Sequence, residues 1–394
     1  MNIFQQRRSV FTTGLSNGFT NARAATVCLA ILFSSLLQSS FAQSPDAKSK
    51  EDKITTEFLE TVVKEFKVPG MVAAVVREGK VATMGAAGVR KQGDRTPITT
   101  TDLLHLGSCT KAMTGTLIAD LIADEEVDLA WDSTIGDVLK KLKNDIHGDY
   151  HDVTLEQLLS HCGGLPANET GTSNESTRKI HNQRLRAIRK TLKAAPPTPV
   201  GEFLYSNMGY IVAGTMAETV TGKTWENLVQ ERLFKPLGMD SAGFGPPGKR
   251  GKIEQPWGHV FVANKHAPVQ IDNVPVLGPA GRVHCTISDW AKFLSLHLSS
   301  DSRPPKILDV ATIRRLQKTT VSDQYAVGWL VGERGWAGGK ILNHAGSNTS
   351  WYAVVWAAPG KDFATLVVTN CGGGEAPAAC DKVAGHFIER FASD

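Results

Sequence analysis

The sequence predicts an α+β protein in which both chain ends contribute to one antiparallel sheet that is flanked by helices. Strand-like runs of apolar residues occur at about 71–88 and return between about 326 and 369. Between them, helical periodicity dominates, and Pro and Gly divide the segments. The order of strands, helices and strands therefore indicates a mostly helical subdomain inserted into the sheet domain.

Residues 1–42 have the features of an export signal. They contain three arginines and no acidic residue, followed by an apolar run over 24–37 and small residues before Gln43. This pattern is typical of a cleaved signal peptide rather than of a membrane-spanning helix. We therefore expect a periplasmic or secreted protein with no transmembrane span in the mature chain and a mobile polar leader at 43–54.

The domain itself is expected over 55–394. Its α/β part would cover about 55–107 and 320–394, and its helical part about 108–319. Glu78-Gly79 has the composition of a hairpin turn between the first two strands. Apolar periodicity then predicts helices at 55–66, 113–122, 155–160, 208–220, 225–233, 288–298 and 381–391. It predicts strands at 71–76, 81–88, 326–331, 341–344, 352–357 and 364–369.

The charge of the chain is nearly balanced. The 394 residues carry a formal charge of +4, and loss of the three signal arginines leaves +1. Bulk charge therefore gives no reason to expect nucleic acid as a partner. The basic stretch 178–193 is expected to be a solvated helical face, with an anion-binding or lid role as the alternative.

Ser108 and Lys111 are the strongest candidates for a catalytic pair. Residues three apart share one face of a helix, so the hydroxyl and the amine can touch. Burial and the positive end of the helix dipole both disfavour the ammonium form and lower the lysine pKa. This arrangement activates a serine without a histidine. An ordinary helix N-cap serine is the alternative, and a second match at Ser176 and Lys179 lies in the basic stretch, where nothing would depress a lysine pKa.

Two further motifs follow in the chain: Tyr205-Ser206-Asn207 before a predicted helix, and His344-Ala345-Gly346-Ser347 at the end of a predicted strand. With Ser108-x-x-Lys111 ahead of them, the chain resembles the penicillin-recognising serine hydrolases. The resemblance is to the branch of class C β-lactamases, D-alanyl-D-alanine carboxypeptidases and esterases, and it covers residues 58–391. It implies a β-lactamase/transpeptidase-like fold. Three other motifs support the family resemblance: Leu158-Leu159-Ser160-His161, Lys235-Pro236-Leu237-Gly238-Met239 and Pro279-Ala280-Gly281.

The resemblance implies three catalytic residues. Ser108 would attack an acyl carbon and become an ester, and Lys111 would take its proton. Tyr205, as phenolate or as hydrogen-bonded phenol, would pass that proton to the leaving group. Taken alone, a tyrosine is usually a core residue with a satisfied hydroxyl, so this role depends on the joint pattern.

Four more residues are implied in substrate binding: Asn207, His344, Gly346 and Ser347. The Asn207 side chain would bind Lys111 and the substrate amide. The backbone N–H groups of Ser108 and Ser347 would form an oxyanion hole. His344 would orient the substrate carboxylate or the leaving group, although an isolated histidine near a strand end is usually a surface residue.

Two departures from the family pattern bear on the substrate. β-Lactamases of this branch typically have Lys-Thr-Gly where this chain has His344-Ala345-Gly346. The histidine form is more familiar in D-amino-acid peptidases, amidases and esterases of the family. Neutral histidine pairs poorly with an anion, so a peptide or ester is expected ahead of a β-lactam. Arg282, where the family has a small or aliphatic residue, is expected to return a positive charge to the cleft.

Five cysteines remain after the signal: Cys109, Cys162, Cys285, Cys371 and Cys380. Their pairing stays open, although Cys371 and Cys380 have the spacing to close a short glycine-rich loop. Cys109 is an alternative nucleophile beside Ser108, but an inward-facing helical cysteine is normally a packing residue. No Cys or His spacing resembles a zinc site, so neither a metal nor another cofactor is expected.

The expected function is that of an exported serine hydrolase that cleaves an amide or ester bond in a small-molecule or peptide substrate. The alternative is a catalytically weak penicillin-binding sensor or scaffold that binds cell-wall fragments. Loss of the serine, lysine or tyrosine would mark that alternative, and all three are present.

Overall fold

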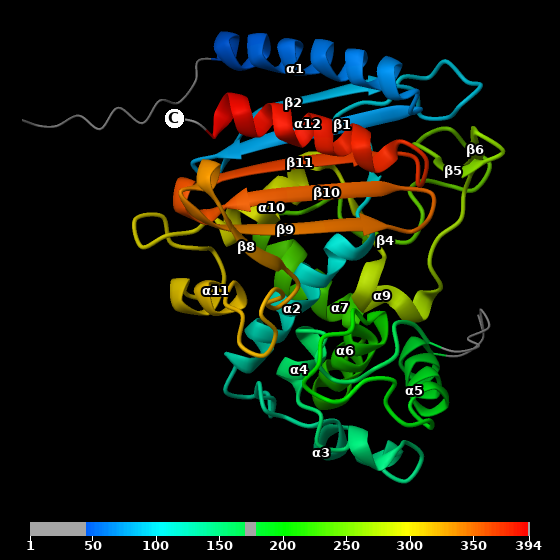
Figure 1. Cartoon of the computed structure of the whole chain (residues 1–394), viewed down its shortest axis with the longest axis vertical. Helices are drawn as coiled ribbons and strands as arrows, with labels where there is room; N and C mark the ends of the chain where they lie inside the picture. The colour runs from blue at the N-terminus through cyan, green and yellow to red at the C-terminus, as the bar shows by residue number, and fades with distance from the viewer. Residues whose placement is uncertain (1–44, 170–178, 393–394) are drawn as a thin grey trace, which may run out of the picture. The chain divides into compact units, whose positions relative to one another are not determined.

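A six-stranded antiparallel sheet is the central feature of the computed structural model, which describes residues 45–169 and 179–392 (Figure 1). Its strand order is β2-β1-β11-β10-β9-β8. Strands from the two ends of the chain thus pair directly, which confirms the predicted α+β fold with one shared sheet. The strands of this sheet are β1 (Gly70–Arg77), β2 (Lys80–Gly88), β8 (Leu330–Arg334), β9 (Gly339–Ser347), β10 (Tyr352–Ala358) and β11 (Phe363–Thr369).

Helices cover both faces of this sheet. On one face, α1 (Pro45–Phe66) and α12 (Ala376–Phe391) pack against it, and on the other α10 (Ile287–His297) does so (Figure 1). Successive side chains of a strand point to opposite faces, so β1 contributes to two cores. This explains why β1 is a continuous apolar run. Met71, Ala73 and Val75 join the core under α1 and α12, and Val72, Ala74 and Val76 join the core under α10.

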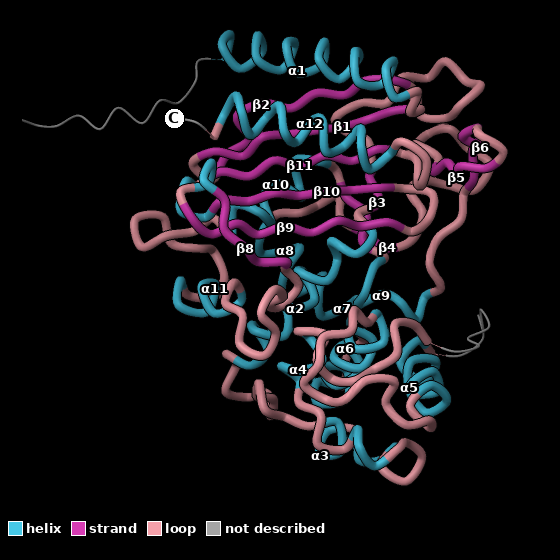
Figure 2. Tube along the Cα trace, in the orientation of Figure 1, coloured by secondary structure: helices cyan, strands magenta, loops and turns pink. Residues whose placement is uncertain are grey.

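The middle of the chain forms the expected mostly helical subdomain (Figure 2). Two of its longer helices, α2 (Thr110–Ile122) and α6 (Asn207–Thr221), are mostly buried. Two small sheets accompany the helices: β3-β7-β4 and the β5–β6 hairpin. The remaining elements are α3 (Ile135–Val138), α4 (Leu155–Leu159), α5 (Ile180–Thr191), α7 (Trp225–Val229), α8 (Lys235–Leu237), α9 (Gly278–Gly281), α11 (Val310–Leu316), β3 (Leu104–His105), β4 (Gly243–Phe244), β5 (Gly258–Val262), β6 (Lys265–Val269) and β7 (Val283–Cys285).

The first helix is longer than expected. It begins at Pro45, so the segment predicted as a mobile leader is helical from that residue onward. Lys48 and Asp52 form an ion pair one helical turn apart, at 2.8 Å. Asp52 also accepts a hydrogen bond from the Met84 N–H of β2 at 2.9 Å. These contacts stabilise the helical conformation of a polar segment whose sequence shows no apolar periodicity.

Other boundaries differ as well. The strand predicted from Ala326 begins only at Leu330. Gly328 has a φ of +82°, and a side chain on it would meet the Ala112 backbone of α2 at 2.5 Å, so 326–329 is a packed loop. The last helix begins at Ala376 rather than at 381. α10, which falls within the predicted helical part at 108–319, packs on the main sheet.

The basic stretch at 178–193 contains one arginine that belongs to the protein interior. Within α5, Arg184 is fully buried and pairs with Glu218 and with Glu226. The basic side chains of Arg186, Arg189 and Lys190 in the same helix are exposed. The predicted solvated face is therefore correct for most of α5 and wrong for Arg184. The predicted export signal, Ser176 and Arg178 lie outside the described residues. No helix in the described ranges is long and apolar enough to cross a membrane.

Candidate active site

Ser108 lies at the centre of a 3₁₀ turn that leads into α2, and β9 packs directly against this turn. Two glycines permit the close approach. A side chain on Gly107 would lie 2.3 Å from the Ser347 nitrogen, and one on Gly346 would lie 2.0 Å from the Leu106 oxygen and 2.8 Å from the Ser108 nitrogen. The backbone of Ser347 and that of Ser108 are thus brought together at one place.

Lys111 is the buried centre of the site, with no exposed surface. Its Nζ lies 3.1 Å from Ser108 Oγ and donates hydrogen bonds to Asn207 Oδ1 at 2.6 Å and to the Ala280 carbonyl at 2.8 Å. Burial lowers the pKa of Lys111 to about 7. A substantial fraction of this amine is therefore neutral at pH 7, which an exposed lysine would not be.

Tyr205 lies beside Lys111, with its ring centroid 4.9 Å from Nζ. Burial raises the pKa of the Tyr205 hydroxyl, and a hydrogen bond with the Ser108 side chain opposes that rise only in part. The hydroxyl therefore stays protonated near neutral pH. Of the two forms expected from the sequence, the structure favours the hydrogen-bonded phenol over the phenolate.

Asn207 is held at the first turn of α6 by the preceding residue, because Ser206 Oγ caps the helix by accepting from the Gly209 N–H at 3.0 Å. The expected contact between Asn207 and Lys111 is present. The other end of the amide, expected to reach the substrate, donates from Nδ2 to Asn168 Oδ1 at 2.8 Å. Asn168 was not foreseen from the sequence.

His344 has a different environment from the one expected. The side chain is 3% exposed, and its Nδ1 lies 2.6 Å from the Ala345 carbonyl. A carbonyl only accepts, so the ring proton is on Nδ1 and the bare Nε2 accepts from the Tyr325 hydroxyl at 2.8 Å. Burial, followed by the charge of Lys111, lowers the pKa of His344 to about 3. The ring is neutral and both nitrogens are occupied, so this geometry does not support direct orientation of a substrate by His344.

Arg282 was expected to bring an unpaired positive charge to the cleft, but in the structure it forms an ion pair. Its Nε donates to Asp272 Oδ2 at 2.9 Å, and both side chains are largely buried. The guanidinium is therefore compensated by a carboxylate and does not return a positive charge to the cleft.

Two aromatic residues of the site were not predicted from the sequence. His161 has a φ of +62°, and its Nδ1 accepts from the Ser206 N–H at 3.0 Å. Its ring lies 4.3 Å from that of Tyr205 and 4.4 Å from that of Tyr325. His161 belongs to the motif Leu158-Leu159-Ser160-His161, which supports the family resemblance, so the sequence did contain a signal that could have identified it as a site residue. Tyr325 lies in the loop before β8, where no local pattern marks it.

The five cysteines of the described chain are free, buried thiols, so Cys371 and Cys380 are not joined in this structure. Cys371 instead contacts Thr369 Oγ1 at 3.3 Å. Burial raises the pKa of the Cys109 thiol, which fits packing rather than nucleophilic attack. Within the described ranges, no group of three or more His, Cys, Asp or Glu side chains is arranged to hold a metal ion.

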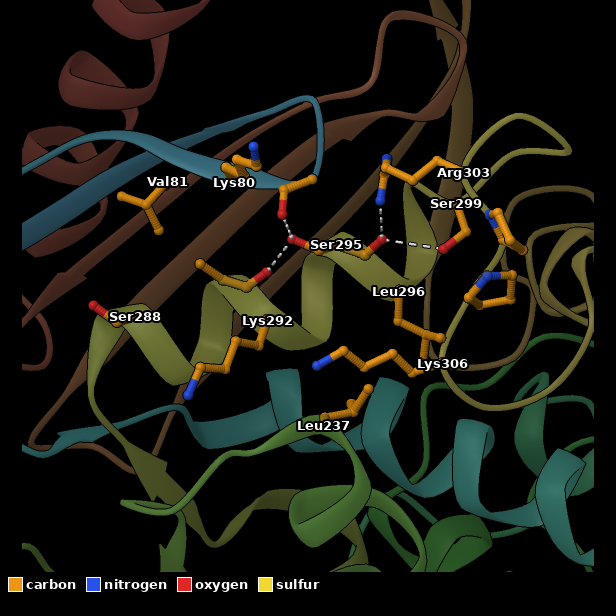
Figure 3. A pocket seen from close by; sticks show the side chains of 14 residues that line it. Lys80, Val81, Leu237, Ser288, Lys292, Ser295, Leu296, Ser299, Arg303 and Lys306 are labelled. Carbon is orange, nitrogen blue, oxygen red and sulfur yellow. Dashed lines mark hydrogen bonds between the residues drawn. The ribbon is translucent and has the colours of Figure 1, made fainter. Parts of the chain in front are cut away.

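A separate cavity of about 450 Å³ lies between α10, the β1–β2 turn and the loop at 303–306 (Figure 3). Small side chains of α10 such as Ser288 and Ser295 form one wall, and Lys80 and Lys306 also line the cavity. The Ser295 hydroxyl already donates to the Gly79 carbonyl at 3.0 Å. None of the predicted catalytic or substrate-binding residues lines this cavity, so the candidate site remains at Ser108.

Comparison with known proteins agrees with the fold. The family model named Beta-lactamase matches residues 55–386. The chain belongs to the Beta-lactamase family. This confirms the resemblance expected from the sequence.

Among relatives of this Beta-lactamase-family chain, the unguisins hydrolase of Aspergillus campestris is 26% identical, over 84% of this chain and 63% of that protein. Penicillin-binding protein 4 of Amycolatopsis lactamdurans is 28% identical, over 78% of this chain and 82% of that protein. The chain thus spans a little under two thirds of the first relative. The crystal structure of a β-lactamase from Sulfitobacter sp. EE-36 matches with a TM-score of 0.69 at 20% identity, over 87% of this chain and 98% of that one, and so shares its fold.

Proposed function

We propose that this Beta-lactamase-family protein is an exported serine hydrolase that forms an acyl-enzyme on Ser108 and cleaves an amide or ester bond. The observation that carries the proposal is the hydrogen bonding of Lys111. Two of its three partners, Asn207 Oδ1 and the Ala280 carbonyl, can only accept. A neutral amine has two hydrogens and one lone pair. With both hydrogens used on these acceptors, the lone pair is left for the remaining partner, Ser108 Oγ.

This geometry makes Lys111 a suitable general base. The Ser108 oxygen would form a bond to the substrate acyl carbon while its proton passes to Lys111. The C–N or C–O bond then breaks, and the departing group takes up a proton through the protonated Tyr205 phenol. Water subsequently hydrolyses the Ser108 ester by the reverse proton transfers, which regenerates the enzyme.

The contact between β9 and the nucleophile turn supports an oxyanion hole. The backbone N–H groups of Ser108 and Ser347 are the proposed donors to the developing negative charge. Gly346 and Gly107 allow the two backbones to meet without side chains between them. Loss of one such donor typically costs about 3–4 kcal/mol of transition-state stabilisation.

The electrostatics of the site favour a substrate without an obligatory free carboxylate. His344 replaces the lysine of the β-lactamase motif and is neutral, and Arg282 is paired with Asp272. We therefore propose a D-amino-acid peptide or an ester as substrate, ahead of a β-lactam. The relative named as an unguisins hydrolase supports hydrolysis as the class of reaction. Initial rates on an aryl ester, a D-Ala-D-Ala peptide and a penicillin, compared on the purified mature chain, would rank these classes.

Covalent labelling tests the proposal directly. After incubation with a fluorophosphonate, mass spectrometry should find the adduct on the peptide that contains Ser108. The Ser108→Ala variant should remain unlabelled, whereas Ser299→Ala, a matched change beside the separate cavity, should be labelled as the wild type is. Binding of penicillin without turnover of any of the three substrates would instead favour a sensor. An unmodified Ser108 in the folded wild-type protein would contradict both the acyl-enzyme and the mechanism.

A further inference from the structure

We infer that Asp272 is a positioning residue that holds the two backbone segments of the proposed oxyanion hole in register with each other. The inference rests on the proposed function, because it concerns how that hole is kept in shape. Asp272 lies in the connection between β6 and α9, is 4% exposed at its side chain, and carries no motif that would reveal it in the sequence.

The first link runs from Asp272 to the nucleophile turn. The side chain of His105, in β3, is fully buried, and its Nε2 lies 2.8 Å from Asp272 Oδ1. The other ring nitrogen, Nδ1, accepts from the Gly107 N–H at 3.1 Å. A ring nitrogen that accepts cannot carry the proton, so the proton is on Nε2, the ring nitrogen that lies nearest to Asp272 Oδ1. Asp272 thereby favours the tautomer that fixes Gly107, the residue immediately before Ser108.

The second link runs from the same oxygen to the end of β9. Asn348 Nδ2 donates to Asp272 Oδ1 at 3.1 Å. Asn348 directly follows Ser347 and is itself held, because its Oδ1 accepts from the Ser350 hydroxyl at 3.1 Å. One carboxylate oxygen therefore contacts Asn348, which directly follows the proposed donor Ser347, and His105, which binds the residue before the proposed donor Ser108.

A third link joins Asp272 to the wall that binds Lys111. Asp272 Oδ2 accepts from Arg282 Nε at 2.9 Å. The neighbouring Asn273 donates from Nδ2 to the Gly281 carbonyl at 2.8 Å, next to the carbonyl that binds Lys111. Burial by itself would raise the pKa of Asp272, but His105, Arg282 and Asn348 hold it below its usual range. The carboxylate is thus ionised at neutral pH, and its hydrogen bonds are charge-assisted.

The consequence is kinetic. Two N–H groups stabilise one oxyanion only if both point at the same small volume, and misplacement by about 1 Å can cost about 100-fold in rate. Substitution of Asp272 by asparagine keeps the size of the side chain but removes the negative charge that holds the His105 and Asn348 side chains in place. We expect a loss of about 10- to 100-fold in the maximal rate, with little effect on the affinity for the reagent.

The test measures labelling of Ser108 by a fluorophosphonate in three variants. In this reaction Ser108 Oγ forms a bond to phosphorus, fluoride leaves, and the serine proton passes to Lys111. Asp272→Asn should lower the saturating labelling rate about 10- to 100-fold, leave the half-saturating concentration within about threefold, and leave the pH midpoint unchanged. Asn348→Ala, which breaks only the second link, should lower the rate about 10-fold. Asp362→Asn, which removes a similar Arg303–Asp362 ion pair elsewhere, should label as the wild type does.

The outcomes separate the two proposals. Absence of labelling in the wild type would overturn the proposed function itself. Labelling of the wild type and of folded Asp272→Asn at equal saturating rates would overturn only the role of Asp272. A shifted pH midpoint of labelling in Asp272→Asn would also overturn the role of Asp272, because the substitution would then slow labelling by changing the pKa of Lys111. If Asp272→Asn does not fold, as judged by circular dichroism, the milder Asn348→Ala variant decides, and a wild-type rate there overturns the inference.

Discussion

Replacement of Asn207 by aspartate should shift the pH dependence of catalysis to higher pH. The Asn207 oxygen lies 2.6 Å from Lys111 Nζ, and the buried amine has a pKa of about 7. If Lys111 acts as the base, the neutral amine is the active form. Wild-type activity is then present above the pKa of Lys111 and lost as the pH falls through about 7, to about 1% of the plateau at pH 5.

The magnitude follows from the distance. At an effective dielectric constant of about 20, a unit negative charge at this separation interacts with the ammonium by about 6 kcal/mol. Desolvation of the new carboxylate offsets part of this, and close opposite charges typically move a pKa by about 1–3 units. The midpoint should therefore rise from about 7 to about 8–10 in Asn207→Asp. At pH 7 the variant would be at least about fivefold slower, yet much of the rate would return at pH 10.

The assay is the pH profile of kcat/KM for p-nitrophenyl acetate, corrected for spontaneous hydrolysis, together with the rate of fluorophosphonate labelling from pH 5 to 10.5. Asn227→Asp, the same change at an exposed position on α7, is the matched control and should keep the midpoint near 7. Recovery at high pH distinguishes a shifted base from a damaged site. An unshifted midpoint in Asn207→Asp, or a wild-type profile that is flat across pH 6–8, would refute the assignment of Lys111 as the base.

Three further predictions concern the same site. Gly346→Ala places a methyl group 2.8 Å from the Ser108 nitrogen, so fluorophosphonate labelling should slow at least about 100-fold while circular dichroism stays native, and normal labelling would contradict the proposed hole. The pKa of Lys111 is about 7 in the folded protein and has its ordinary value of 10.5 in the unfolded chain, so the unfolded chain binds more protons between these two values. In urea unfolding, the wild type should gain about 1.4 kcal/mol per pH unit relative to Lys111→Met from pH 7 to 10, and parallel stabilities would show that the folded amine is not perturbed. Cys109 is buried and its thiol pKa is raised, so iodoacetamide at pH 8 should leave it unmodified and Cys109→Ala should still be labelled at Ser108; loss of labelling there would point to a chemical role for the thiol.

Local sequence patterns predicted much of the fold because their physical causes are local. The apolar run of β1, the turn at Glu78-Gly79 and the periodicity of α6 each depend on neighbouring residues. Errors arose where tertiary contacts decided the outcome. The polar start of α1 is anchored by the Met84 N–H, and Gly328 interrupts the strand predicted at 326–331 because it packs against α2.

The sequence by itself determined that Ser108 and Lys111 share one face of a helix start, since spacing along a helix sets which side chains meet. It also determined the order of the three motifs and, through them, the family. Only the tertiary structure decided that Lys111 is fully buried between Asn207 and Ala280, that His344 is a neutral group bonded to Tyr325, and that Arg282 is compensated by Asp272. The physical reason is that desolvation and ion pairing depend on segments far apart in the chain, and no local pattern records which of them fold over a given residue.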